Sequence, residues 1–403
     1  MKILVADKFE QIGIDGLRAL GCEVVLNPDL KEESLVEAIQ NEKPQVLVVR
    51  STKVTAPMLE DSTLGLVIRA GAGYNTIDVD TASRMGIFVA NCPGKNSIAV
   101  AELAFGLMLA ADRKIPDNVI ELRKGNWNKK RFSKSRGLHG RMLGLVGMGN
   151  IGQEMITRAK GFGMFVNAFS RWMTPDVAAA LGIGRANSLL ELAESSDFVS
   201  VHVSLTPETR GMLGEEFFQA MRPGSVFVNT SRAEVVDQAA LLRAVESGKV
   251  FACLDVFEGE PSTGEGTYDG PLKDQPNVYC THHIGASTDQ AQEAVANEVI
   301  RIVKEYKTTG QAPNVVNVSK GENVAQVLVV RHADKVGVLA HVLEALKQDS
   351  VSVQEMENIV LGGAQAAIAQ MALDKPISDS AHENIRRHPD IFDVGVFSSG
   401  ATA

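Results

Sequence analysis

Three charged or titratable residues stand just after short apolar runs in the second half of the chain: Arg232, Glu260 and His283. A histidine can take a proton from a hydroxyl group, and a neighbouring carboxylate favours its imidazolium form and fixes its tautomer. An arginine can bind a carboxylate and polarise a developing carbonyl oxygen. Together these groups suffice for the oxidation of a 2-hydroxy acid. Each alone is more often structural, and the residues themselves do not distinguish His283 from its neighbour His282.

A glycine fingerprint typical of dinucleotide binding lies earlier in the chain. The apolar run 141–146 is followed by Gly-Met-Gly-Asn-Ile-Gly at 147–152, a helix-like run, and a second apolar run at 165–169. In this context the glycines permit a tight turn, a close approach to a diphosphate and close helix packing. The diphosphate would lie on free N–H groups at the helix N-terminus. An ordinary glycine turn is the alternative, and the predicted cofactor residues are Gly147, Gly149, Asn150, Ile151 and Gly152.

The second apolar run ends in Ser170-Arg171, where the fingerprint usually has an acidic residue that accepts hydrogen bonds from a ribose. A hydroxyl followed by a guanidinium suits a 2′-phosphate, because arginine binds phosphate oxygens in pairs. We therefore predict NAD as the cofactor, with NADP as an alternative that Ser170 and Arg171 favour. The competing interpretation is that Arg171 is only a solvated surface residue.

The composition limits the kind of protein. A chain of 403 residues predicts two or three domains, and its net charge of -9 argues against nucleic-acid binding as the main role. Its four cysteines are scattered, which favours reduced thiols. The segment 1–7 resembles a first strand, and the longest apolar run, 98–111, is too short to span a bilayer. We expect a cytoplasmic protein that binds a small molecule, with no membrane partner and no metal site.

The elements that must position these residues alternate between short apolar runs and helical patterns. This alternation predicts an α/β fold with two doubly wound parallel sheets, the first from runs at 3–6, 23–26, 46–49 and 67–70, and the second from runs at 141–146, 165–169, 198–203, 225–228, 250–254 and 278–280. Ligands bind outside the carboxyl ends of such strands. There, Gly71-Ala72-Gly73 could hold a small carboxylate on its N–H groups. A long helix is expected from Asn96 or Ser97 toward Arg123.

The last part of the chain predicts a separate small domain. After the turn-rich segment 307–313, strands are expected at 325–330, 351–356, 366–373 and 393–397, and helices at 338–347 and 380–387. This βαββαβ order is ferredoxin-like and suits regulation or assembly. We predict a substrate-binding domain from 1–96 and 286–318, a dinucleotide-binding domain at 97–285 and a regulatory domain at 322–399.

Nearly the whole chain resembles the D-isomer-specific 2-hydroxyacid dehydrogenase family. The resemblance rests on motifs beginning at Val49, Arg69, Asn96, Gly147, Leu205, Val228, Leu254 and His283. The family's catalytic Arg, Glu and His would then be Arg232, Glu260 and His283, since His283 precedes Ile-Gly and His282 stands where the family usually has Pro. The resemblance also implies cofactor contacts at Pro207, Thr230 and Asp255, and substrate contacts at Arg50, Ser51, Gly71, Ala72, Gly73 and Asn96.

Within the family, the resemblance is strongest to members that oxidise 3-phosphoglycerate to 3-phosphohydroxypyruvate in serine biosynthesis and end in an ACT domain. The segment 332–339 falls where that domain binds an amino-acid effector. Members inhibited by serine typically have Asn where this chain has Asp334 and Ser352, so the effector is expected to differ. The basic loop Lys129-Lys130-Arg131 is either a solvated face or a contact with an anionic substrate, within one chain or across a subunit boundary.

Two alternatives to this function are an NADP-dependent hydroxypyruvate or glyoxylate reductase and, less favoured, a dinucleotide-sensing protein similar to transcriptional corepressors. Ala233-Glu234 replaces the usual Gly-rich step after Arg232, a change that resembles the reductases. The ACT-like tail favours a metabolic enzyme. A symmetric homodimer or homotetramer is expected.

Overall fold

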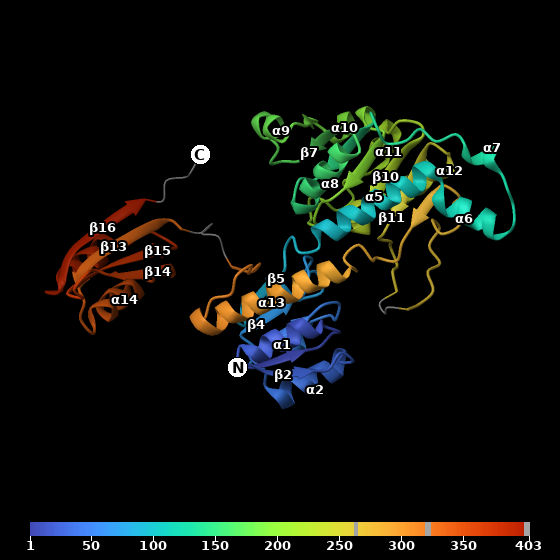
Figure 1. The fold of residues 1–403 in the computed structure, drawn as a ribbon. Helices are drawn as coiled ribbons and strands as arrows, with labels where there is room; N and C mark the ends of the chain where they lie inside the picture. The colour runs from blue at the N-terminus through green and yellow to red at the C-terminus, as the bar shows by residue number, and fades with distance from the viewer. Residues whose placement is uncertain (262–264, 319–323, 399–403) are drawn as a thin grey trace. The chain divides into compact units, whose positions relative to one another are not determined.

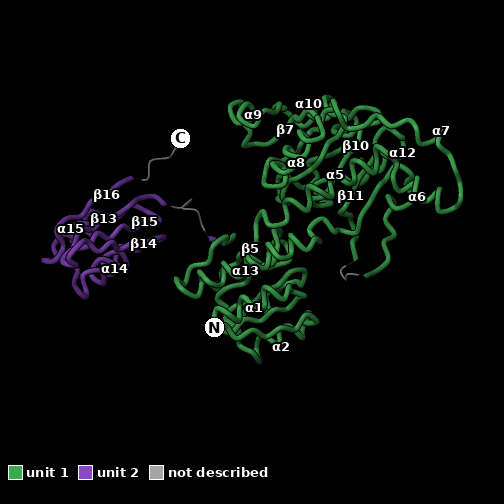
Figure 2. The backbone as a smooth tube through the Cα atoms, viewed as in Figure 1, with its two compact units in different colours: residues 1–317 green, residues 318–403 purple. Residues whose placement is uncertain are grey.

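The computed structural model describes residues 1–261, 265–318 and 324–398. Packing divides the chain into two compact units, residues 1–317 and residues 318–403 (Figure 2). The first unit contains two parallel sheets, and the second contains one antiparallel sheet. The predicted fold class is therefore confirmed.

The first sheet has the flavodoxin-like strand order β2-β1-β3-β4-β5. Its strands are β1 (Lys2–Val5), β2 (Glu23–Leu26), β3 (Val46–Val49), β4 (Leu66–Arg69) and β5 (Phe88–Asn91). One face is covered by α1 (Gln11–Ala19) and α13 (Asp289–Thr309), and the other by α2 (Glu32–Glu42), α3 (Ala56–Leu59) and α4 (Val79–Arg84) (Figure 1). The edge strand β5 was not predicted, because it is short and is followed at once by the turn-forming residues Cys-Pro-Gly at 92–94.

The second sheet has the order β12-β11-β10-β9-β6-β7-β8, so the strand order reverses between β6 and β9. Its strands are β6 (Met142–Val146), β7 (Phe165–Phe169), β8 (Gly184–Arg185), β9 (Phe198–Val201), β10 (Ser225–Asn229), β11 (Val250–Leu254) and β12 (Val278–Cys280). Buried side chains of α5 (Ser97–Arg113), α8 (Asn150–Gly161) and α9 (Pro175–Leu181) pack on one face, and those of α10 (Leu189–Ser195), α11 (Glu215–Ala220) and α12 (Gln238–Glu246) on the other. Ligands bind at such a reversal point.

The single long helix expected from residue 97 toward Arg123 is two helices. The first, α5, ends at Arg113, Lys114 takes a left-handed backbone with φ of 53°, and α6 (Ile115–Arg123) begins directly after it. Pro116 explains the break, since proline fits the first turn of a helix but not its interior. A short helix, α7 (Lys129–Phe132), follows α6.

The second unit has the strand order β14-β15-β13-β16, which is the ferredoxin-like arrangement. Its elements are β13 (Gln326–Ala333), α14 (Val338–Gln348), β14 (Val353–Val360), β15 (Ala366–Leu373), α15 (Asp379–Arg386) and β16 (Ile391–Ser398). Both helices bury apolar side chains against the sheet. Among the described residues of the whole chain, no helix is both long and apolar enough to cross a membrane.

A buried carboxylate on α13 fastens three segments of the first unit. Glu298 is 6% exposed and pairs with Lys95 at 3.1 Å and with Arg301 at 2.6 Å, while Asn314 donates to it at 2.7 Å. The Arg301 hydrogen bond, with those of Asn314 and Lys95, holds the pKa of Glu298 at about 2 against the effect of burial. Lys95 directly precedes the predicted substrate residue Asn96, so this cluster braces the segment that links the two sheets.

Replacing Glu298 with Gln is expected to lower the free energy of unfolding by about 2 to 3 kcal/mol at neutral pH. A carboxyl whose pKa is depressed on folding stabilises the protein above its unfolded value, near 4.5, and this contribution disappears as pH falls toward about 2. Urea denaturation across this range should show the two proteins converging. Glu305→Gln, at an exposed ion pair of 3.5 Å, should cost about 0.5 kcal/mol or less. Equal losses in both variants would contradict the argument.

Candidate active site

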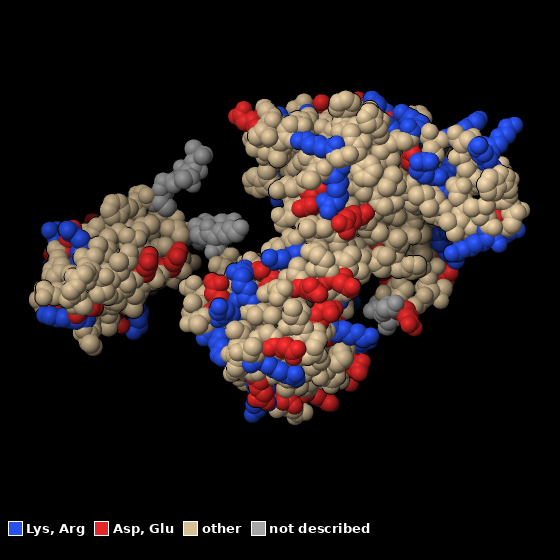
Figure 3. Space-filling model, viewed as in Figure 1, with Lys and Arg blue, Asp and Glu red and all other residues tan. Residues whose placement is uncertain are grey.

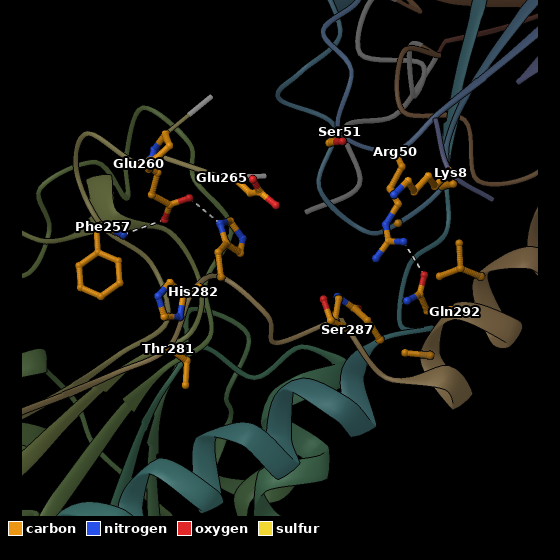
Figure 4. Close-up of a pocket in the computed structure, with 18 of the residues that line it drawn as sticks. Lys8, Arg50, Ser51, Phe257, Glu260, Glu265, Thr281, His282, Ser287 and Gln292 are labelled. Carbon is orange, nitrogen blue, oxygen red and sulfur yellow. Dashed lines mark hydrogen bonds and ion pairs between the residues drawn. The ribbon is translucent and has the colours of Figure 1, made fainter. Parts of the chain in front are cut away.

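A cavity of about 810 Å³ lies between the carboxyl ends of the two parallel sheets. Figure 4 shows Lys8, Arg50 and Ser51 on one side of it, and Phe257, Glu260 and His282 on the other. The first three follow β1 and β3, and the second three follow β11 and β12. Because parallel strands end at one edge of a sheet, residues far apart in the chain meet around this cavity.

His283 and Glu260 form a hydrogen-bonded pair at the cavity wall. The His283 Nδ1 lies 2.7 Å from one Glu260 carboxylate oxygen, and the backbone N–H of Phe257 donates to the other at 2.8 Å. Burial opposes ionisation, but the bonds from His283 and Phe257 hold the pKa of Glu260 below its ordinary value. A charged Glu260 fixes the proton on Nδ1, which leaves Nε2 of the ring to accept a proton.

Asp255 holds the loop that carries His283. Its carboxylate is 1% exposed, with Thr281 Oγ1 donating at 2.6 Å and the backbone N–H groups of Ile284 and Gly285 donating at 2.9 and 2.8 Å. His283 itself takes a left-handed backbone, with φ of 53°. The sequence predicted a cofactor contact for Asp255, and that contact stays a prediction. The observed bonds make Asp255 a positioning residue for His283.

Three arginines converge on the same region. The Arg232 guanidinium lies against the backbone of Gly73, since a Cβ added there would stand 2.1 Å from its Nη2. Burial, then the charges of Arg232 and Arg50, lowers the pKa of Arg69 to about 10. Its Nε is buried and has no hydrogen-bond partner among the described residues. The mutual repulsion of these cations favours an anion bound between them.

The substrate-side loops are held by contacts of their own. Asp7 accepts hydrogen bonds from the backbone N–H groups of Arg50, Ser51 and Thr52 at 2.6, 3.2 and 3.1 Å, and from the Ser51 hydroxyl at 3.0 Å. The Arg50 guanidinium donates to Gln292 on α13 (Figure 4).

The turn at Gly71 to Gly73 is fixed from β5 and the segment that follows it. The backbone N–H of Cys92 donates to the Gly71 carbonyl at 2.9 Å, and Asn91 donates to the Ala72 carbonyl at 2.6 Å. Asn96, at the N-terminus of α5, also lines the cavity. Thus the predicted substrate residues are brought to one place.

The glycine fingerprint has the geometry that a bound dinucleotide needs. Gly147 has φ of 95°, and a Cβ there would lie 2.5 Å from the His202 carbonyl oxygen. The position of Gly149, by contrast, opens onto free space at the N-terminus of α8, which begins with Asn150. Thr230, just after β10, has a buried hydroxyl oxygen without a hydrogen-bond partner among the described residues. An open backbone turn at the end of β6 and an unpartnered hydroxyl at the end of β10, in the same sheet, fit a polar cofactor.

The other predicted cofactor residues belong to elements and turns of the same sheet. Ile151 packs on the core of the second sheet, and Pro207 lies in an exposed turn after β9. Arg171 follows β7, next to β6 and the glycine turn, and its guanidinium lies 5.3 Å from the centre of the Trp172 ring. Ser170 accepts from the Trp172 N–H at 3.4 Å.

The sequence missed some residues at this site and included others that lie elsewhere. Arg69, Lys8 and Asp7 were not predicted, although Arg69 begins the motif that continues into Gly71 to Gly73. A charged residue that ends an apolar run gives no sign of the direction of its side chain. The basic loop 129–131 forms α7 and does not line this cavity. Its side chains are exposed, and Figure 3 shows Lys and Arg gathered over that helix.

Comparison with known proteins agrees with this geometry. Residues 105–285 match the family model for D-isomer specific 2-hydroxyacid dehydrogenase, NAD binding domain. The TT0316 protein of Thermus thermophilus is 31% identical, with a TM-score of 0.70, over 78% of this chain and 100% of that one. The chain belongs to the D-isomer specific 2-hydroxyacid dehydrogenase family. The family predicted from the sequence is therefore confirmed.

Other members of the family include enzymes with different substrates. The D-3-phosphoglycerate dehydrogenase of Methanocaldococcus jannaschii is 41% identical over 320 residues, which are 79% of this chain but only 59% of that relative's length. The NAD+-bound 3-phosphoglycerate dehydrogenase of Entamoeba histolytica is 26% identical, with a TM-score of 0.65, over 79% of this chain and 98% of that one. A glyoxylate reductase from Paecilomyes thermophila is 27% identical, with a TM-score of 0.70, over 78% of this chain and 98% of that one.

Proposed function

We propose that this chain oxidises 3-phosphoglycerate to 3-phosphohydroxypyruvate with NAD. The observation that carries the proposal is the His283–Glu260 pair across a cavity from a wall rich in cations. A proton-transfer pair suits a hydroxyl substrate, and the cations suit one with more than one negative group. The 3-phosphoglycerate dehydrogenases among its relatives support the same substrate.

In this mechanism Arg232 binds the substrate, and His283 with Glu260 transfers the proton. Arg232, with the backbone N–H groups near Gly73, binds the substrate carboxylate and orients the hydroxyl toward His283 Nε2. His283 removes the hydroxyl proton as the C2–H bond breaks, and Glu260 stabilises the imidazolium that forms. Bound NAD supplies the acceptor for the hydride. The alcohol thus loses one proton and one hydride and becomes a carbonyl group.

The cofactor would lie on the glycine turn and the N-terminus of α8, with Thr230 and Pro207 beside it. We propose NAD as the main cofactor. Arg171 stands at the position that contacts the ribose in such folds, so we also propose that the chain binds NADP with measurable affinity.

Replacing Arg171 with Asp is expected to weaken NADPH binding about ten-fold or more, and to change NADH binding little. The lost contact is one between a guanidinium and a 2′-phosphate, which NADH lacks. Titration of the nicotinamide fluorescence measures both affinities without turnover. Arg18→Asp, at an exposed position of α1, is the matched control. If the affinities for NADPH and NADH fall equally, Arg171 does not bind the 2′-phosphate.

We propose that two copies of this chain associate through the region of α6 and α7. No residue of α6 is buried, and Ile120, Leu122 and Trp127 are 51%, 55% and 83% exposed. A second copy of the same surface would cover these apolar side chains. Such a dimer would also give Lys129, Lys130 and Arg131 a route to the partner's substrate. A homotetramer remains compatible with this contact.

For the second unit we propose an ACT-like regulatory role, in the domain division predicted above. The segment after β13 is exposed at Asp334 and Val336, as an effector loop requires. Asp334 adds a carboxylate there, so we propose an amino-acid effector other than serine. The four cysteines are free, which agrees with a reducing compartment such as the cytoplasm. The net charge of -9 favours neither nucleic acid nor an anionic membrane as partner.

Steady-state turnover of 3-phosphoglycerate and of glycerate, each with NAD and with NADP, tests this function. We expect 3-phosphoglycerate with NAD to have the highest kcat/KM. Turnover limited to NADP(H) and unphosphorylated acids would make the chain a hydroxypyruvate or glyoxylate reductase. No turnover, with intact dinucleotide binding, would favour the corepressor-like alternative.

A further inference from the structure

Lys8 has a position in the cavity that the mechanism above does not use. It follows Asp7, whose carboxylate is occupied by the 50–52 loop, so the two segments are fastened together. Figure 4 shows Lys8 beside Arg50 and Ser51, across the cavity from Glu260. The Lys8 backbone is thus held close to predicted substrate residues, on the wall opposite the proton-transfer pair.

The contacts of Lys8 differ from those of other cations around the cavity. Arg50 donates to Gln292, and Lys273 pairs with Asp269 at 2.7 Å. Lys8 forms no hydrogen bond or ion pair with any described residue. Its ammonium group is therefore available to an anion that enters the cavity.

We propose that Lys8 binds the phosphoryl group of the substrate and so determines the preference for a phosphorylated acid; this inference rests on the proposed function. The substrate carboxylate is assigned to Arg232 and the hydroxyl to His283, both from the second sheet. The third substituent then extends toward the first sheet, where Lys8 and Arg50 present two positive charges. An ammonium group on a flexible stem suits a phosphoryl dianion.

The other charged groups on the cavity wall set limits on this site. Glu10 and Glu265 also line the cavity, as do His282 and His283. The two carboxylates would repel a dianion, so a cation on the phosphoryl side is needed for tight binding. Removing the Lys8 charge should therefore weaken a phosphorylated acid selectively.

Lys8→Met, Lys8→Arg and a control, Lys53→Met, test the proposal with 3-phosphoglycerate and with glycerate. Lys53 is exposed, follows β3 as Arg50 does, and does not line the cavity. For Lys8→Met we expect KM for 3-phosphoglycerate to rise about ten-fold to a hundred-fold, with KM for glycerate unchanged within about two-fold. Lys8→Arg should restore most of the loss. Inorganic phosphate should inhibit glycerate oxidation in the unaltered protein and lose this effect in Lys8→Met.

The outcomes separate this inference from the proposed function. An equal rise of KM for both acids, or none for either, overturns the role of Lys8 and leaves a phosphoglycerate preference of the unaltered protein intact. If the unaltered protein oxidises only glycerate, the proposed function fails. In that case a phosphate inhibition lost in Lys8→Met still supports an anion site at Lys8, and its persistence overturns that site too.

Discussion

Replacing His283 with Ala is expected to lower kcat about a thousand-fold to ten-thousand-fold while NAD still binds. The His283 ring holds a proton-accepting nitrogen toward the cavity because Glu260 occupies its Nδ1 at 2.7 Å. No remaining group has both this position and this partner among the described residues, so the hydroxyl proton would have to pass to water. Stopped-flow measurement of NADH formation, with fluorescence titration of NADH binding, separates lost chemistry from lost binding.

His282 gives the matched control, because it is the same residue type on the same loop. His282 is exposed, and of these two neighbouring histidines it is His283 that is hydrogen-bonded to Glu260. His282→Ala should therefore keep kcat within about three-fold, a small effect beside that of removing a general base. Equal losses in the two variants would refute the assignment of the base.

The second large effect is expected at Arg232. Arg232→Gln should lower kcat/KM about a thousand-fold or more, because a charged, two-pronged contact to the substrate carboxylate and carbonyl oxygen disappears. The melting temperature should change little, since the guanidinium bonds its neighbour Ser231 at 2.7 Å and Asn75 at 3.5 Å, both of them weak supports for the fold. Arg232→Lys should recover only part of the loss, because an ammonium group cannot form the paired contact.

Gly73→Ala probes the same contact without removing a charge. The added Cβ would stand 2.1 Å from the Arg232 Nη2, so the guanidinium must move, and kcat/KM should fall about ten-fold to a hundred-fold. Gly106→Ala, in α5, introduces the same methyl group into open space and should leave activity unchanged. Unaltered kinetics in Gly73→Ala would show that Arg232 does not need its place against this turn.

Much of the fold was predictable because its signals are local. The apolar runs that became β6 and β7, with the glycine turn between them, are contiguous in the chain. So is the βαββαβ pattern of the second unit. The break at Lys114 also had a local cause in Pro116, but the helical pattern on both sides concealed it. The short edge strand β5 gave too weak a signal.

The interior of the site was less predictable because its contacts join distant segments. Arg69 is a basic residue at the end of an apolar run, and only the approach of Arg50 and Arg232 reveals it as part of an anion site. The bonds of Asp255 to the loop of His283 likewise appear only after β11 and β12 are paired. The residue types indicated the chemistry, whereas the supporting contacts required the fold.

The division of the cavity between two sheets has a consequence for how such enzymes diversify. Arg232 and His283, the groups proposed to bind the carboxylate and hydroxyl common to every 2-hydroxy acid, both follow strands of the second sheet. In the proposed arrangement the third substituent faces Lys8 and Arg50, which line the cavity and follow strands of the first sheet. Substitutions in the two loops that carry Lys8 and Arg50 can therefore change which acid is accepted, whereas the turn at Gly73, against which Arg232 lies, is constrained by the reaction. Substrate choice can therefore evolve in loops that do not carry the proton-transfer pair.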